Sequence, residues 1–308
     1  MSTKEKTLIV IAGPTAVGKT HLCIDIARQL QTEILSADSR QIFKELNIGT
    51  AAPSPQQLEA VRHHFVGTRS IDEYYTAGIF EMEALEVLEK IFTRHDRALM
   101  TGGSGLYIDA VCHGIDALPK VDQQVRQNLL EQYEEEGIEG LRQQLKMLDP
   151  ASYKRVDLQN PKRVLKALEI TLTTGKPYSS FLTRKSKQRP FRILKVGVTR
   201  KREDLYERIN KRVEQMIDQG LVEEARSLYP HRHLNALNTV GYKELFSHFE
   251  GEISFQEAVR LIKRNTRRYA KRQLTWFSKD KHYTWFHPEE KDRILRYIKE
   301  QTEQHGKT

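Results

Sequence analysis

The residues that point most directly to chemistry form a glycine-rich loop near the start of the chain. Residues 13–20 read GPTAVGKT, the full pattern G-x-x-x-x-G-K-[ST] of a phosphate-binding loop (P-loop). In such a loop, backbone N–H groups point at bound phosphate, the lysine supplies a charge, and the final hydroxyl can reach Mg²⁺. We therefore expect polyphosphate to be bound by Gly13, Pro14, Thr15, Ala16, Val17, Gly18, Lys19 and Thr20, with Thr20 as the metal ligand.

A carboxylate at the end of a second apolar run is the next candidate. An ordinary P-loop ATPase or GTPase holds Mg²⁺ with a second acid at a strand end, but the apolar run 98–101 continues into Gly102-Gly103 without one. The acid that does follow an apolar run is Asp38. Because the carboxyl ends of parallel strands line the ligand crevice, Asp38 should lie near the P-loop. It could assist magnesium, act as a general base, or simply cap a helix.

A second glycine-rich turn, Gly-Gly-Ser-Gly at 102–105, follows the run 98–101. Its small residues would let another molecule approach the backbone closely. The simpler interpretation is an ordinary turn from a strand into a helix.

Positive charge is concentrated towards the C-terminus. Between Phe255 and Lys281 the chain has nine Lys or Arg and two Asp or Glu. On a helical wheel the apolar side carries Val259, Ile262, Tyr269, Trp276 and Phe277, and the opposite half carries Arg260, Lys263, Arg264, Arg267, Arg268, Lys271 and Arg272. Such a face favours a polyanionic partner, although a solvated surface helix is the plainer alternative. A second basic element contains Lys162, Arg163 and Lys166.

The elements that must position these residues alternate between strands and helices. Apolar runs at 8–12, 34–37, 98–101 and 192–198 predict buried strands, and 19–30 predicts a helix directly after the P-loop. This order predicts an α/β core with a parallel sheet flanked by helices. Residues 118–190 show only helical periodicity, with Asn160-Pro161 as an N-cap followed by a first-turn proline. We therefore expect a core formed by 1–117 and 191–308, and a helical insertion at 118–190.

Composition narrows the setting. The 308 residues are 38% hydrophobic and 30% charged, and the net charge of +9 (pI about 9.3) favours a polyanionic partner. No apolar run is long enough to span a bilayer, and the N-terminus lacks the pattern of a signal peptide. Two cysteines do not make a disulfide framework, and Cys23 is expected to be a buried thiol. We expect a soluble, cytoplasmic protein that makes no membrane contact, and no feature demands more than a monomer.

Together these segments resemble one family, the tRNA dimethylallyltransferases, also called tRNA isopentenyltransferases. The resemblance covers nearly the whole chain, and the order of the segments is the family's. They are GPTAVGKT at 13–20, DSRQIF at 38–43, NIGTAAP at 47–53, GGSGLY at 102–107, NPKRVLKALE at 160–169, VGYKE at 240–244 and TRRYAKRQLTWF at 266–277.

The resemblance implies a reaction and roles for particular residues. Members transfer a dimethylallyl group from dimethylallyl diphosphate to the exocyclic amine of the adenosine 3′-adjacent to the anticodon of a tRNA. That adenosine is flipped into the core. Asp38 would be the general base and Ser104 would help to position the site. Mg²⁺, Lys19, Thr20, and Arg208 or Arg212 would neutralise the leaving diphosphate, and the insertion would grip the anticodon stem.

The resemblance also implies a set of residues in contact with tRNA. They are Asp38, Ser39, Arg40, Gln41, Ser104, Arg126, Lys162, Arg163, Lys166, Gly241, Tyr242, Lys243, Arg267, Lys271, Arg272 and Gln273.

The sequence departs from the family in places. Ser104 stands where threonine is usual, which keeps the hydroxyl, and Lys166 stands where arginine is common, which loses the planar fork. No cysteine follows Cys112, so the zinc finger of eukaryotic members is absent and the bacterial type is indicated. The pair His63-His64 could suggest a metal, but without a third ligand nearby a packing or surface role is favoured.

Two other functions compete with the family's. A P-loop kinase would explain Lys19, Thr20 and Asp38, but would leave the basic helix and the insertion unexplained. A nucleic-acid-binding module with a purely structural phosphate site would bind tRNA without turnover.

Overall fold

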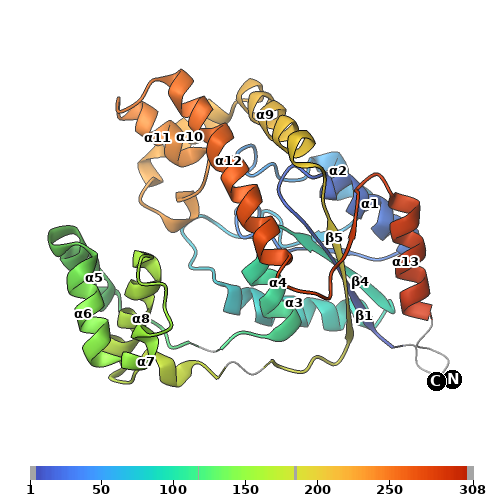
Figure 1. Cartoon of the computed structure of the whole chain (residues 1–308). Coiled ribbons are helices and arrows are strands. Elements are labelled where there is room, and N and C mark those ends of the chain that lie inside the picture. Colours follow the sequence, from blue (N-terminus) through green and yellow to red (C-terminus); the bar gives the residue numbers. More distant parts are fainter. Residues whose placement is uncertain (1–4, 117, 184–185, 304–308) are drawn as a thin grey trace. The chain divides into compact units, whose positions relative to one another are not determined.

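The computed structural model describes residues 5–116, 118–183 and 186–303. It divides the chain into two compact units, the first formed by 1–113 and 188–308 and the second by 114–187 (Figure 1). None of the described helices is both long and apolar enough to cross a membrane.

A parallel sheet of six strands forms the centre of the first unit, which confirms the predicted α/β class. Its spatial order is β3-β2-β4-β1-β5-β6. The strands are β1 (Thr7–Ala12), β2 (Ile34–Ser36), β3 (His63–His64), β4 (Arg97–Gly102), β5 (Arg192–Val198) and β6 (Thr284–Phe286).

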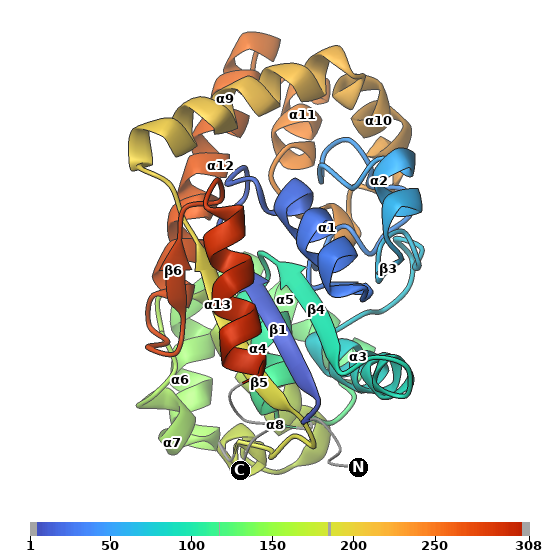
Figure 2. The ribbon, with the colours of Figure 1, turned by 90° about the vertical axis from the view of Figure 1, so that its right-hand side faces the viewer.

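Helices cover both faces of this sheet. α1 and α13 lie side by side on one face, and α3 and α4 pack together on the other (Figure 2). The helices of this unit are α1 (Lys19–Leu30), α2 (Pro55–Ala60), α3 (Ala77–Phe92), α4 (Gly105–His113), α9 (Arg202–Asp218), α10 (Leu221–Leu228), α11 (Tyr242–Phe249), α12 (Phe255–Phe277) and α13 (Lys291–Glu303), with short 3₁₀ turns at Tyr229–His231 and Asn235–Leu237.

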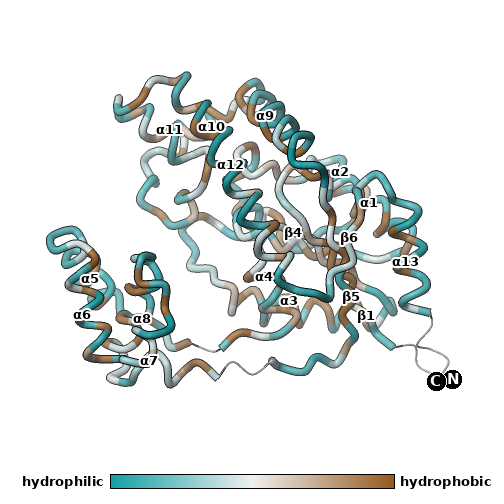
Figure 3. The backbone as a smooth tube through the Cα atoms, in the orientation of Figure 1, coloured by the Kyte–Doolittle hydropathy of each residue, from teal (hydrophilic) through white to brown (hydrophobic). Residues whose placement is uncertain are grey.

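The central strands are apolar on both sides because helices cover both faces. Residues 8–12 of β1 are fully buried, and the brown stretches of β1, β4 and β5 in Figure 3 mark this core. Ile9 and Ile11 pack with α1 and α13 in one cluster of buried side chains. This core keeps the strands in one register, and that register determines which loops meet at the candidate site.

That register brings three loops to the same edge of the sheet. Ala12 at the end of β1 pairs with Gly102 of β4, and Ser36 at the end of β2 pairs with Thr101. The segments that follow these strands begin at Gly13, Ala37 and Gly103. The P-loop, the Asp38 segment and the second glycine-rich turn are therefore neighbours.

The sequence analysis missed the two edge strands. β3 has two residues and β6 has three, and neither has the apolar run from which the longer strands were predicted. Edge strands are covered less completely than central ones, so their sequences carry a weaker signal.

All the described elements of the second unit are helical. They are α5 (Gln123–Glu136), α6 (Ile138–Leu148), α7 (Pro150–Tyr153), α8 (Pro161–Thr174) and a 3₁₀ turn at Tyr178–Phe181. Its core contains Leu129, Leu141, Leu145 and Leu168. Asn160 is the N-cap of α8 and Pro161 its first residue, as predicted, although the Asn160 side chain makes no capping hydrogen bond.

The second unit begins and ends slightly earlier than the predicted 118–190. The C-terminal boundary of the second unit falls before Arg189, because the Arg189 guanidinium donates to the carbonyls of Ala110 (2.7 Å) and Val111 (2.8 Å). It also forms a buried ion pair with Glu81 (2.8 Å). Residue 189 is thereby anchored to the first unit. Residues 1–4 and 117 of the predicted core segment lie outside the described residues.

Candidate active site

One cavity of about 890 Å³ lies at the carboxyl edge of the sheet, within the first unit. Its walls come from the P-loop, the Asp38 segment, residues 47–55, α9 and α12. The predicted site residues that line it are Thr15, Ala16, Gly18, Lys19, Thr20, Asp38, Arg40, Gln41, Arg208, Arg212, Gly241 and Gln273. Predicted residues of this unit that do not line it are Gly13, Pro14, Val17, Ser39, Ser104, Tyr242, Lys243, Arg267, Lys271 and Arg272.

The P-loop is folded around its own lysine. The Nζ of Lys19 donates to the carbonyl oxygens of Gly13 (2.8 Å) and Pro14 (2.7 Å). Burial lowers the pKa of Lys19 to about 8. An anion in the loop would oppose this effect, because negative charge favours the protonated form. Gly13 itself packs tightly on β5, where an added Cβ would clash with the carbonyl of Val198.

Arginines outside the P-loop hold it from the side. The Nε of Arg208 donates to the carbonyl of Ala16 (3.0 Å), and Arg212 donates to the Thr15 hydroxyl (3.3 Å). Arg200 was missed by the sequence analysis, yet its Nε donates to the carbonyl of Val17 (2.9 Å). This contact is evident only in the folded chain, where the connection between β5 and α9 lies against the P-loop.

Two of these arginines contribute directly to the cavity wall. Arg208 and Arg212 are one helical turn apart on α9, and both line the cavity. Burial and the neighbouring charge of Arg208 lower the pKa of Arg212. Lys211, which the sequence analysis also missed, lines the same wall. This end of the cavity is therefore strongly cationic.

Asp38 lies in the same cavity as Lys19, as predicted. Its Oδ1 accepts hydrogen bonds from the backbone N–H groups of Arg40 (3.0 Å) and Gln41 (3.3 Å). Within the described part of the chain, Oδ2 accepts no hydrogen bond. Asp38 thus caps a turn and not the start of a helix, so the helix-cap interpretation was wrong. One oxygen holds this turn, while the other remains able to accept a proton.

Ser104 stands behind this carboxylate rather than in the cavity wall. Its hydroxyl accepts from the backbone N–H of Ser39 (2.9 Å) and hydrogen-bonds to the Ser39 side chain (3.1 Å). The two predicted residues Ser39 and Ser104 therefore brace each other beside Asp38.

Tyr269 of α12 is a cavity residue that the sequence analysis had assigned to the apolar, core-packing side of its helix. Burial and the nearby charge of Asp38 raise the pKa of Tyr269 to about 12. A tyrosine is protonated at neutral pH with or without this shift, so the phenol can act as a hydrogen-bond donor.

Gln273 connects two of the cavity walls. Its Oε1 accepts from the backbone N–H of Thr15 (2.8 Å), and its Nε2 donates to the carbonyl of Gly103 (3.0 Å). A Cβ at Gly103 would clash with Gln273, and one at Gly105 would clash with Trp276. These glycines thus let α12, a part of the same chain, approach the turn. The idea that the turn admits another molecule has no support from this packing.

Residues 47–51 form a further part of the cavity wall, to which sequence reasoning gave no role. The Nε2 of Gln41 donates to the carbonyls of Thr50 and Ala51 (3.1 Å each). Tyr242, predicted to contact tRNA, is fully buried, and its hydroxyl donates to Glu224 (2.7 Å). Tyr242 could influence tRNA only indirectly, because its side chain does not reach the surface.

The cavity lining also includes apolar side chains. They are Ile48, Val213, Met216, Leu221, Val240 and Ile262. A lining that combines cationic and apolar side chains suits a ligand that has a charged head and an uncharged remainder.

The basic face of α12 is narrower than predicted. Lys263 is paired with Glu214 of α9 (2.6 Å), and Arg267 donates to Asn210 (2.6 Å). Trp276 is not a core residue: it is 41% exposed, and its Nε1 donates to Asp109 (2.9 Å). The predicted cations that remain exposed are Arg260, Arg268, Lys271 and Arg272, and Arg260 is paired with Glu257.

The predicted tRNA contacts of the second unit fall into two groups. Lys162 and Arg163 of α8 are exposed. Arg126 of α5 forms an ion pair with the buried Glu169 (3.1 Å), and Lys166 lies 3.9 Å from the other oxygen of that carboxylate. Glu169 therefore holds Arg126 and Lys166 close together.

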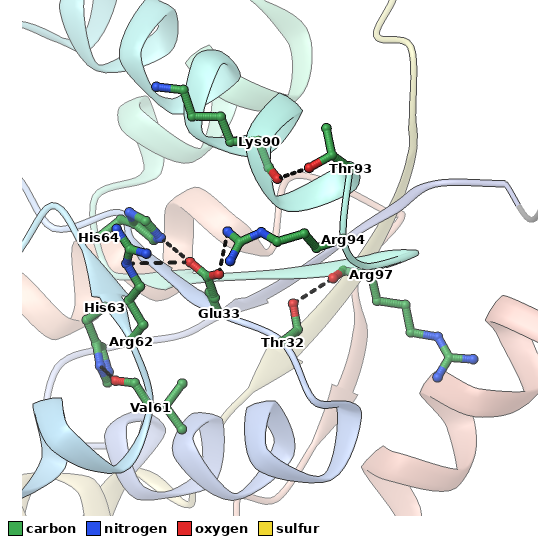
Figure 4. A network of polar contacts seen from close by, with 10 residues as sticks. All are labelled: Thr32, Glu33, Val61, Arg62, His63, His64, Lys90, Thr93, Arg94 and Arg97. Carbon is green, nitrogen blue, oxygen red and sulfur yellow. Dashed lines mark hydrogen bonds and ion pairs between the residues drawn. The ribbon is translucent and has the colours of Figure 1, made fainter.

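The histidine pair has a structural explanation. His64 lies 2.7 Å from the carboxylate of Glu33, which Arg94 also contacts at 2.8 Å (Figure 4). His63 hydrogen-bonds to the carbonyl of Val61 (2.7 Å) and lines the rim of the cavity. No group of three His, Cys, Asp or Glu placed to hold a metal occurs in the described ranges. The contact of His64 with Glu33 is compatible with the packing or surface role favoured from the sequence.

The cavity could nevertheless accept a magnesium ion that arrives with a phosphate ligand. Mg²⁺ commonly binds through one or two protein oxygens, several waters and phosphate oxygens. The Thr20 hydroxyl lines the cavity and, among the described residues, has no hydrogen-bond partner. Asp38 supplies a carboxylate in the same cavity. These donors fit the ion without a complete cage of protein ligands.

Comparisons with known proteins agree on one family. The family model described as IPP transferase matches residues 41–280. tRNA dimethylallyltransferase 1 of Bacteroides thetaiotaomicron is 54% identical over 299 residues, which cover 97% of each chain. The tRNA dimethylallyltransferase of Christiangramia forsetii is 53% identical, covering 94% of this chain and 97% of the relative.

Solved structures resemble this one over most of its length. The full-length tRNA isopentenylpyrophosphate transferase of Bacillus halodurans is 34% identical, with a TM-score of 0.71 and 98% of both chains covered. A eukaryotic dimethylallyltransferase acting on tRNA is 26% identical, with a TM-score of 0.69, 88% of this chain covered and 69% of the other. The resemblance stated from the sequence is confirmed.

Proposed function

Because the chain belongs to the IPP transferase family, we propose that it transfers a dimethylallyl group from dimethylallyl diphosphate to tRNA. The acceptor is the exocyclic amine of the adenosine 3′-adjacent to the anticodon, and the product is isopentenyladenosine. The relatives of this chain carry that activity in their names.

A single observation supports this proposal most strongly: Lys19 and Asp38 share one cavity whose lining also includes apolar side chains. The cationic side chains suit the diphosphate, the apolar ones suit the uncharged parts of the substrates, and Asp38 supplies a carboxylate in the same cavity.

The reaction is a substitution at the first carbon of the dimethylallyl group. The adenosine nitrogen forms a bond to this carbon, the carbon–oxygen bond breaks, and the diphosphate leaves with the electron pair. Asp38 accepts the proton that the amine loses, through Oδ2, while Oδ1 holds the turn. Tyr269, protonated at neutral pH, is placed to donate a hydrogen bond within the site.

The leaving diphosphate needs neutralisation, because negative charge grows on it as the bond breaks. Lys19, Arg208 and Arg212 supply positive charge from the chain. Mg²⁺, held by the Thr20 hydroxyl, would supply further charge stabilisation to the diphosphate oxygens.

We propose that tRNA is bound through its phosphates by basic side chains of both units. Lys271 and Arg272 are exposed on α12, as are Lys162 and Arg163 on α8. Ser39, Arg40, Gly241, Lys243 and Gln273 belong to the predicted set of tRNA contacts. We further propose a cytoplasmic monomer, in keeping with the absence of any sequence feature that requires otherwise.

The test is to incubate unmodified tRNA with the protein, dimethylallyl diphosphate and Mg²⁺, and to analyse the nucleosides by mass spectrometry. Isopentenyladenosine should appear only in the complete reaction, and addition of EDTA should suppress it. A protein that leaves tRNA unmodified but phosphorylates a small acceptor with ATP would overturn the proposal.

A further inference from the structure

Glu224 of α10 makes the most heavily bonded contact with the cavity wall at residues 47–51. Its Oε2 accepts from the backbone N–H groups of Asn47 (3.1 Å) and Ile48 (2.8 Å). Its Oε1 accepts from the backbone N–H of Gly49 (2.9 Å) and from the Tyr242 hydroxyl (2.7 Å). Three successive N–H groups that converge on one carboxylate form an anion-binding nest, here filled by the protein's own side chain.

A nest filled in this way cannot serve as a phosphate site. The effect of Glu224 is instead to fix the backbone of residues 47–49, because four donors bind one charged group. Gly49 packs so closely on the Tyr242 ring that an added Cβ would lie 2.6 Å from it. Gln41 holds the next two carbonyls, those of Thr50 and Ala51. The wall is thus attached to α10 and α11 on one side and to the Asp38 segment on the other.

We propose that Glu224 is a positioning residue for the transfer reaction, acting through residues 47–51. This inference rests on the proposed function. Neither Glu224 nor Tyr242 lines the cavity, whereas Ile48, Gly49 and Thr50 do. The wall they form is joined to Asp38 through Gln41. By fixing it, Glu224 keeps the acceptor amine and the donor carbon aligned, and a displacement of about 1 Å can lower a rate about a hundredfold.

The kinetic test compares Glu224→Gln with Glu223→Gln, a neighbouring exposed glutamate that makes no contact with the wall. The glutamine keeps the shape of Glu224, but one of its two oxygens becomes an NH₂ group that faces the same donors. We expect kcat to fall about tenfold or more in Glu224→Gln. The inhibition constant of inorganic diphosphate should change less than about twofold, because other residues hold the P-loop. Glu223→Gln should behave as the unsubstituted protein.

Tyr242→Phe is a milder variant, because it removes one of the four donors and leaves the ring in place. Its kcat should fall only a few-fold. It also keeps the inference testable if Glu224→Gln fails to fold. A Tyr242→Phe protein with unchanged kcat and unchanged wall protection would then count against the role of Glu224.

Amide hydrogen exchange measures directly how firmly the backbone of residues 47–49 is held. In Glu224→Gln the amides of residues 47–49 should exchange faster, while those of the P-loop remain as protected as before. The inference is overturned by unchanged kcat, by unchanged protection of 47–49, or by parallel losses of kcat and diphosphate affinity. Failure of the proposed function looks different, because the unsubstituted protein and Glu223→Gln would then also transfer no prenyl group.

Discussion

Two walls of the cavity, the P-loop at 13–20 and the segment at 47–51, are held in similar ways but differ in what they can bind. Both are short loops fixed by side chains from distant helices. In the P-loop, arginines of the β5–α9 region hold carbonyl and hydroxyl oxygens. In the 47–51 segment, Glu224 occupies the backbone N–H groups. The first wall is left cationic and able to accept an anion, and the second is left unable to bind one.

Under the proposed function, this difference separates two tasks. The charged part of the donor binds at the P-loop, whereas the segment at 47–51 helps to align the reacting groups near Asp38. Binding and alignment can therefore be disturbed separately, by changes in different walls. The following predictions test that separation.

The largest effect is expected at Asp38, which lines the same cavity as both walls. Asp38→Asn should lower kcat about a hundredfold or more, because the amide cannot take the proton from the amine. The asparagine oxygen can still accept from the N–H groups of Arg40 and Gln41, so the turn should persist. Single-turnover prenyl transfer measures the rate, and filter binding should show little change in tRNA affinity. A variant that keeps its full rate would remove Asp38 from the role of base.

Changes in the P-loop wall should act on binding. Lys19→Met should weaken the affinity for inorganic diphosphate by about ten- to a hundredfold, the usual strength of a charge-assisted hydrogen bond. Titration calorimetry in the presence of Mg²⁺ measures this affinity. If Glu224→Gln weakens it equally, the two walls do not have separate functions.

The pH dependence of diphosphate binding should follow Lys19. Burial places its pKa at about 8 in the free protein, so the side chain is charged below this pH and becomes neutral above it. The affinity for inorganic diphosphate should therefore decline between pH 7 and pH 9, by up to about tenfold. Lys19→Met should remove the part of this decline that belongs to the protein, and a variant with the same pH profile as the unsubstituted chain would contradict the assignment.

The smallest effect is expected outside both walls, on α12. Lys271→Ala should weaken tRNA binding a few-fold and reduce the slope of log affinity against log salt by about one, as expected for one lost phosphate contact. Lys263→Ala is the matched control, because Lys263 already pairs with Glu214. If the two substitutions changed the salt slope equally, the ion pair with Glu214 would not determine which cations of α12 bind phosphate.

Much of the P-loop wall could be predicted from the sequence, because its function resides in a contiguous pattern with a strand before it and a helix after it. Asp38 could be placed beside it because parallel strands end at one edge. Arg200, Tyr269 and Glu224 could not be placed in the same way. Each contacts the site from a helix or strand end that is far away in the chain, and no local sequence pattern indicates such a contact.

The basic helix shows the same limit from the other direction. Its helical period and its charge were correctly read, but seven cations on one face were expected to be available. Pairing with α9 removes Lys263 and Arg267 from that set, and exposure of Trp276 puts an aromatic residue where burial was expected. A helical wheel describes one helix alone, whereas the freedom of a cation to bind a partner depends on side chains of neighbouring helices.

The sequence by itself determined the α/β class, the phosphate loop, the candidate base and the family, because each depends on residues close together in the chain or on the order of segments. Only the tertiary structure decided which charges remain free, which glycines serve packing, and how the wall at 47–51 is held. Those properties depend on side chains that meet across long stretches of chain, where hydrogen bonds and ion pairs are set by three-dimensional packing.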